Sequence, residues 1–227
     1  FGKTLSEYVK FRKLNFETPM LNVLLGYTLI SFVATVCSNL VDIDFRTSIS
    51  EKLSENEAGI WTAMSSISKI YMQFLIAIFS LYILPKYAEI NSSFGFRSEL
   101  KSIYKSLLPL VVLGMLIVYF LREFIVLTIY NEAFLSMTLL FKWQLLADFM
   151  RFIANVMSFK FLAKKQISYF IYTQLLGLLL YHVLGHHLIE TYKTEGVVMG
   201  LFVSNLIYLG SVMTVLRHDL FGKNRPM

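Results

Sequence analysis

Residues 167–188 read ISYFIYTQLLGLLLYHVLGHHL, a run that contains no Asp, Glu, Lys or Arg. About 20 such residues in a helix cross the hydrocarbon core of a bilayer. The other long apolar runs, each extendable toward this length by small or singly polar neighbours, are residues 21–41, 70–84, 107–120, 152–163 and 197–216. Backbone groups in hydrocarbon must bond to one another, and the strict alternation of a membrane barrel is missing. The sequence therefore predicts an all-α integral membrane protein, a bundle of six transmembrane helices.

The composition agrees with this fold class. With 56% hydrophobic residues and a mean hydropathy of +0.60, the 227-residue chain has more apolar surface than one soluble core can bury. The net charge of +6 would suit a nucleic-acid partner only if the basic residues gathered on one face. Their positions along the chain indicate a different role, so we expect no nucleic-acid partner.

The basic residues alternate between connections. Fourteen of the 21 Lys and Arg residues precede the first run, follow the sixth, or lie at the connections between runs two and three and between runs four and five. The alternate loops hold three basic residues, Lys52, Arg122 and Lys193, and seven acidic ones, and the other four basic residues lie within the expected spans. This alternation follows the positive-inside rule and predicts a multi-pass membrane protein with both ends cytoplasmic. The basic surplus would then face anionic membrane lipids.

The predicted organisation has three parts. They are a cytoplasmic amphipathic connecting segment at 1–18, a six-helix transmembrane lobe at 19–217, and a cytoplasmic tail at 218–227. We expect the spans at about residues 19–46, 58–84, 103–121, 139–162, 167–188 and 196–216. Pro85 is expected to stop the second span, and residues 124–134 to form a segment too short to cross. Because residue 1 is Phe and not an initiator Met, we expect the chain to be part of a longer protein.

Polar residues follow one face of several spans, which predicts a water-filled cavity. A charge at the centre of a span costs roughly 2.5–3.5 kcal/mol, so such residues seldom face lipid. The candidate cavity-lining residues are Asp42 and Arg46 in the first span, Lys69 and Gln73 in the second, and Gln144, Asp148 and Arg151 in the fourth. Fixed cations suit an anionic diphosphate, and carboxylates suit coupling to a proton or a monovalent cation.

Purely structural roles for the same residues stay open. The charges can pair among themselves as links between helices, and Asp148 and Arg151, three residues apart, can satisfy each other locally. Arg46 lies near the outer end of its span, from which it can extend to the membrane surface.

Three histidines lie near the outer end of the fifth span, in the pattern H-x-x-x-H-H at His182, His186 and His187. A membrane di-iron site would need several histidine motifs of this kind, and the remaining histidine, His218, is expected on the opposite side of the membrane. This predicts an interfacial role and no metal site. We find no nucleophile elbow, phosphate-binding glycine loop or C-x-x-C pair, so we also predict no catalytic residue and no cofactor.

Three stretches carry a resemblance to a known family. Residues 58–74 read AGIWTAMSSISKIYMQF, with YILP at 82–85, and LREF at 121–124 and FKWQLLAD at 141–148 follow in order. This series resembles the Wzx-type flippases of bacterial polysaccharide assembly, most of all the branch that serves enterobacterial common antigen. The likeness extends over about residues 20–217.

The resemblance implies a transporter in the multidrug/oligosaccharidyl-lipid/polysaccharide exporter superfamily, of which this chain would be the C-terminal six-helix lobe of twelve helices. It implies that undecaprenyl-diphosphate-linked oligosaccharide is moved to the outer leaflet by alternating access, for O-antigen or common antigen, with no bond made or broken. The implied partners are this glycolipid, membrane lipids and an N-terminal six-helix lobe. Arg46 falls where the family has an arginine, whereas Lys69 stands where the enterobacterial member has an acid, so ion coupling is not carried over.

Two other functions are weighed against this one. A cation-coupled multidrug exporter of the same lobe fold would have a more apolar cavity with fewer fixed cations. A membrane-embedded polysaccharide polymerase or ligase would usually present a large outer loop bearing acids or arginines, and the predicted outer loops here are short.

Overall fold

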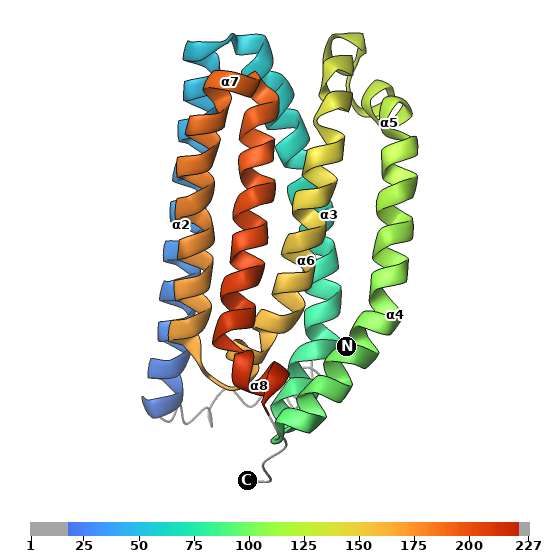
Figure 1. The fold of residues 1–227 in the computed structure, drawn as a ribbon. Coiled ribbons are helices and arrows are strands. Elements are labelled where there is room, and N and C mark those ends of the chain that lie inside the picture. Colours follow the sequence, from blue (N-terminus) through green and yellow to red (C-terminus); the bar gives the residue numbers. More distant parts are fainter. Residues whose placement is uncertain (1–17, 223–227) are drawn as a thin grey trace, which may run out of the picture.

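The structure is a computed structural model that describes residues 18–222. Every regular element in this range is a helix (Figure 1). The elements are α2 (Thr18–Lys52), α3 (Glu55–Glu89), α4 (Ser93–Phe120), α5 (Arg122–Ile129), η2 (Glu132–Leu139), α6 (Phe141–Ala163), α7 (Ile167–Val215) and α8 (Arg217–Phe221). The all-α prediction is confirmed, while the predicted segment 1–18 lies, apart from Thr18, outside the described residues.

The long helices run up and down along one direction. The start of α2, the α3–α4 and α6–α7 connections and α8 lie at one end, and the 53–54 turn, α5 with η2, and the bend in α7 lie at the other (Figure 1). Ser54 and Ser92 cap the helices that follow them, accepting hydrogen bonds from the backbone N–H groups of Glu57 and Gly95. The expected short segment is present as α5 and η2, each of eight residues and so too short to cross a bilayer.

Helix α7 consists of two antiparallel arms. Lys193, with φ 54° and ψ −139°, is non-helical and reverses the chain between arms that span residues 167–192 and 194–215. The two arms pack closely where Gly200 meets Gly185, since a Cβ atom on Gly200 would lie 2.7 Å from the backbone nitrogen of Gly185. Gly210, on the same arm, faces open space.

Pro85 does not end the second helix, contrary to the prediction. Helix α3 continues through Pro85 to Glu89, because Ile83 and Tyr87 are fully buried and hold this last stretch against the bundle. The Tyr87 ring packs edge-on against Phe96 of α4, with ring centroids 5.1 Å apart. This packing offsets the hydrogen bond that proline cannot donate.

The predicted cytoplasmic tail begins with α8, which packs on α4 and α6. Ser93 donates a hydrogen bond to Asp219 at 2.8 Å, and Lys160 forms an ion pair with the same carboxylate at 2.6 Å. Arg97 donates to the carbonyl of Gly222 at 2.9 Å. These contacts fix the end of the chain that follows α7.

Within the described residues, three helices are long and apolar enough to cross a membrane: α3, α4 and α7. Leu81 and Phe120, on the first two, are 80% and 76% exposed, as side chains that face lipid would be. Helix α6 is long enough but carries Lys142, Asp148, Arg151 and Lys160. The count of six spans stays a prediction.

The core has two parts with a polar layer between them. Toward the 53–54 turn, Phe45, Met64 and Phe141 are fully buried. Toward the other end, Phe96, Phe152 and Val212 are buried among α3, α4, α6 and α7. Asp148 of α6 and Ser68 of α3 lie between these two clusters along their helices.

Candidate functional site

The first group of predicted site residues lies on α2 and α3. Lys69 of α3 forms an ion pair with Asp42 of α2, so a charge without a partner on its own helix finds one on its neighbour. The Lys69 side chain is 51% exposed and that of Asp42 22%. The pair therefore links the two helices while remaining open on one side.

Arg46 and Gln73 extend this group in both directions. Each is exposed and lies four residues from one member of the pair, so helical spacing places it on the same face. Because α2 and α3 are antiparallel, Arg46 lies one turn above the pair and Gln73 one turn below, about 12 Å apart along the helices. We call Asp42, Arg46, Lys69 and Gln73 the α2–α3 polar stripe.

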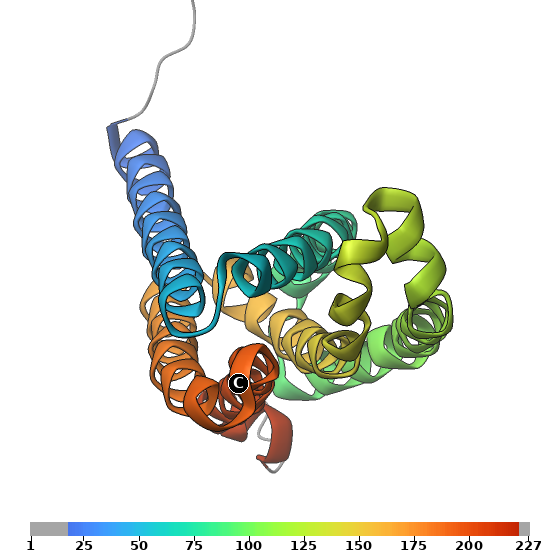
Figure 2. The same cartoon turned by 90° about the horizontal axis from the view of Figure 1, so that it is seen from above.

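The two helices that carry this stripe are joined by the 53–54 turn and by the Lys69–Asp42 ion pair. Viewed along the bundle (Figure 2), α2 in blue and α3 in teal meet at the 53–54 turn and diverge toward their other ends. Arg46 has no carboxylate partner within ion-pair distance among the described residues, and its side chain is exposed. The stripe therefore offers an available cation next to a neutralised pair.

The second group is a buried carboxylate network between α3 and α6. Asp148 is 1% exposed and accepts hydrogen bonds from Ser68 Oγ at 2.6 Å and from the hydroxyl of Tyr71. Gln144 Nε2 donates to both carboxylate oxygens at 3.2 and 3.3 Å, and to Ser68 Oγ at 2.8 Å. Neutral donors therefore satisfy this carboxylate, and no Lys or Arg of the described chain forms an ion pair with it.

Arg151 belongs to neither group. Its side chain is exposed, and the local ion pair with Asp148 that the spacing allowed is not formed. The structure thus divides the predicted site residues between an exposed stripe and a buried network. Their roles in binding and coupling stay predictions.

Two members of the buried network were missed by the sequence analysis. Ser68 and Tyr71 lie one turn apart on the side of α3 that faces α6. The stripe taken from the sequence followed Lys69 and Gln73, which lie on the exposed side of the same helix. The sequence offered one signal for them, a serine three residues before a tyrosine in an apolar helix. This spacing puts the two side chains on one face but does not say which helix that face contacts.

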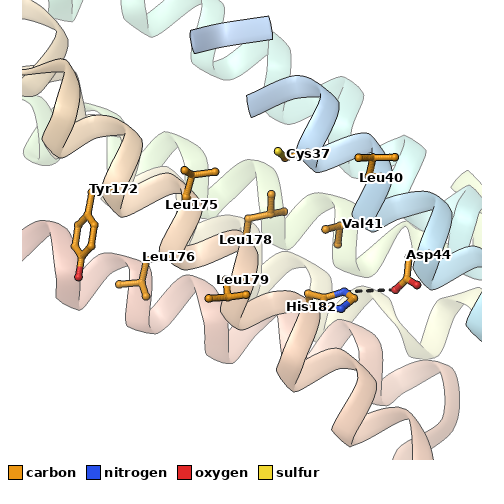
Figure 3. Close-up of a pocket in the computed structure, with 10 residues that line it drawn as sticks. All are labelled: Cys37, Leu40, Val41, Asp44, Tyr172, Leu175, Leu176, Leu178, Leu179 and His182. Atoms are coloured by element: carbon orange, nitrogen blue, oxygen red, sulfur yellow. Dashed lines mark ion pairs between the residues drawn. The ribbon is translucent and has the colours of Figure 1, made fainter. Parts of the chain in front are cut away.

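An apolar groove runs between α2 and the first arm of α7 (Figure 3). Its volume is about 690 Å³, and its lining residues are Cys37, Leu40, Val41, Asp44, Tyr172, Leu175, Leu176, Leu178, Leu179 and His182. Asp44 and His182 lie together at one end of it, joined by an ion-pair contact of 3.4 Å. The remaining lining residues are apolar apart from the thiol of Cys37 and the hydroxyl of Tyr172.

At that end the structure gathers three side chains that can ligate a metal ion. One ligand atom each from Asp44, His182 and His186 lies within 4.8 Å of the others. His187 is exposed and lies outside this group. The sequence analysis did not bring Asp44 to the histidines.

Comparison with curated proteins finds the lipid III flippases of Escherichia coli K12 and Shigella flexneri, each 27% identical over 200 residues. The alignment covers 88% of this chain and 48% of the relative, so the chain spans about half the length of these relatives. No family model and no solved structure matches the chain. Both relatives are named as flippases, which are transporters and not enzymes.

Proposed function

We propose that this chain forms one six-helix lobe of a twelve-helix flippase in the bacterial inner membrane. The flippase carries undecaprenyl-diphosphate-linked oligosaccharide from the cytoplasmic to the outer leaflet for surface polysaccharide, O-antigen or common antigen. Both ends of the described bundle face the cytoplasm, and an N-terminal six-helix lobe completes the transporter. The similarity to proteins named lipid III flippases supports this at the level of the family.

The observation that carries the binding site is the state of Arg46. A diphosphate carries at least two negative charges and needs a compensating cation where water is scarce. Lys69 is already paired with Asp42, whereas Arg46 is exposed one turn away with no carboxylate partner among the described residues. Arginine stays protonated and grips two phosphate oxygens at once, so Arg46 binds the diphosphate and Gln73 contacts the polar part of the same ligand.

The two alternative functions fit these features less well. A multidrug exporter binds hydrophobic cations, and an arginine without a carboxylate partner on an open polar stripe would repel such a substrate. A polymerase or ligase would be an enzyme, whereas both curated relatives are named as flippases.

We also propose that Asp148 carries the coupling ion, and that this ion is a proton. Ser68, Tyr71 and Gln144 all direct hydrogen atoms at the carboxylate, which leaves no cage of oxygen acceptors for a metal cation. A carboxylate buried without a cationic partner exchanges protons when a conformational change alters its surroundings.

The test of the binding site uses the full-length protein that contains this chain, expressed in cells whose own flippase is deleted. Arg46→Ala should abolish surface polysaccharide at wild-type protein abundance, and Arg46→Lys should retain part of it. Arg217→Ala is the matched control, since Arg217 is an exposed arginine on α8, at the other end of the bundle. Normal export by the Arg46→Ala protein at wild-type abundance would remove this residue from the site.

A further inference from the structure

We propose that Asp44, His182 and His186 bind a divalent transition metal ion, for which Zn²⁺ is the natural choice. The site links α2 to the first arm of α7 near the end of the bundle that holds the 53–54 turn. It goes beyond the proposed flippase function and does not depend on it. Four observations on this cluster support the proposal.

The first observation is an unsatisfied ring nitrogen. Although 41% of the His182 side chain is exposed, its Nδ1 atom is buried and has no hydrogen-bond partner among the described residues. It lies 3.4 Å from Asp44 Oδ2, too far for a good hydrogen bond. Two ligands at about 2.0–2.1 Å from one tetrahedral zinc ion lie about 3.3 Å apart. The orphan nitrogen thus stands at the separation that shared coordination requires.

The second observation is that both imidazoles converge on one carboxylate oxygen. His186 Nε2 lies 2.5 Å from the same Asp44 Oδ2, and His182 and His186 lie four residues apart on one face of α7. A cation that replaces the proton of the His186–Asp44 hydrogen bond, and widens this contact to the roughly 3.3 Å of shared coordination, would bind both nitrogens and the carboxylate at once.

The third observation is that the rings are held in place. Phe45 is fully buried and stacks on His186, with ring centroids 5.0 Å apart and planes 21° apart. Gly185 lies against the Phe45 ring so closely that any side chain there would collide with it. Packing therefore fixes the distance between α2 and α7 at this level, as a preorganised metal site requires.

The fourth observation concerns the surrounding charges. The ion-pair contacts of Asp44 go to the two histidines, and no Lys or Arg of the described chain pairs with it. Lys52 is held by Glu190 at 3.3 Å, and Lys69 by Asp42. The carboxylate charge therefore remains available to a cation.

The ligand set indicates the kind of metal. Two neutral imidazoles and one carboxylate suit Zn²⁺ and its transition-metal neighbours, whereas Mg²⁺ and Ca²⁺ prefer oxygen ligands alone. Three protein ligands leave one position of a tetrahedral site to water or another oxygen ligand.

The test uses the full-length protein, purified with a tag that contains no histidine and stripped with a chelator. Co²⁺ serves as the spectroscopic probe and Zn²⁺ content is measured by mass spectrometry. We expect wild type to bind one more equivalent than Asp44→Asn, His182→Gln or His186→Gln. His187→Gln is the matched control and should bind as wild type does. Equal metal content in wild type and the three ligand variants would overturn the proposal.

A gain of signal guards against variants that lose metal because they misfold. In a Cys37→Ser background, His182→Cys should add a thiolate-to-Co²⁺ charge-transfer band, because residue 182 would then supply sulfur to the metal. A folded His182→Cys protein that binds Co²⁺ without this band would show that residue 182 is not a ligand. Co²⁺ uptake unchanged by Asp44→Asn in that background would overturn the site as well.

Discussion

Replacing Asp148 separates two roles that the buried network combines, stabilising the α3–α6 contact and carrying a coupling proton. Asp148→Ala would remove the acceptor of three hydrogen-bond donors, Ser68, Tyr71 and Gln144, of which only Gln144 keeps a partner, the Ser68 hydroxyl oxygen. At about 0.6–1.7 kcal/mol per hydrogen bond between membrane helices, the loss is about 2–5 kcal/mol. Asp148→Asn keeps one oxygen acceptor and the volume of the side chain. Its cost is therefore nearer one hydrogen bond, about 0.6–1.7 kcal/mol.

Two measurements on the full-length protein test this. Thermal unfolding in detergent should show a large loss for Asp148→Ala and a small one for Asp148→Asn. Surface polysaccharide in flippase-deficient cells should be lost with Asp148→Asn although the protein stays abundant, because an amide cannot take up and release a proton. Tyr71→Phe, which removes one donor and leaves the carboxylate, should keep export. Normal export by Asp148→Asn would refute the coupling role, and wild-type stability of Asp148→Ala would refute the structural one.

Two further predictions concern the fold. Gly200→Val should destabilise the protein by about 1–3 kcal/mol, because its Cβ atom would meet the backbone of Gly185 at 2.7 Å. Gly210 faces open space, so Gly210→Val should be nearly neutral in the same unfolding assay. Equal effects of the two substitutions would contradict the close contact between the arms of α7. In a cysteine-free background, a cysteine at Glu55 should react with an impermeant reagent on intact cells and one at Lys164 should not. The reverse labelling would invert the proposed orientation.

Much of the helical fold was readable from the sequence, because long uncharged runs and a switch of charge between loops leave few arrangements. Pro85 was misjudged for a physical reason: burial of Ile83 and Tyr87 on either side of it stabilises the last turn of α3. Such packing is invisible to a rule that considers proline alone.

The candidate site shows the same limit. Helical spacing groups Arg46 with Asp42 and Gln73 with Lys69, since each pair lies four residues apart on one helix. It could not say that Asp148 faces α3, because periodicity defines a face and not its neighbour. Contacts across large separations, such as the one between Asp44 and His186, 142 residues apart, depend on how the helices assemble.

The reversal of α7 at Lys193 has a mechanical consequence. A single residue joins the two arms, so the connection has no slack, and the Gly185–Gly200 contact prevents one arm from sliding past the other. The arms must therefore translate and tilt as one stiff lever. Any change of shape in the bundle has to take place around this lever, and α2, whose Phe45 packs against Gly185 and His186 of the first arm, moves with it.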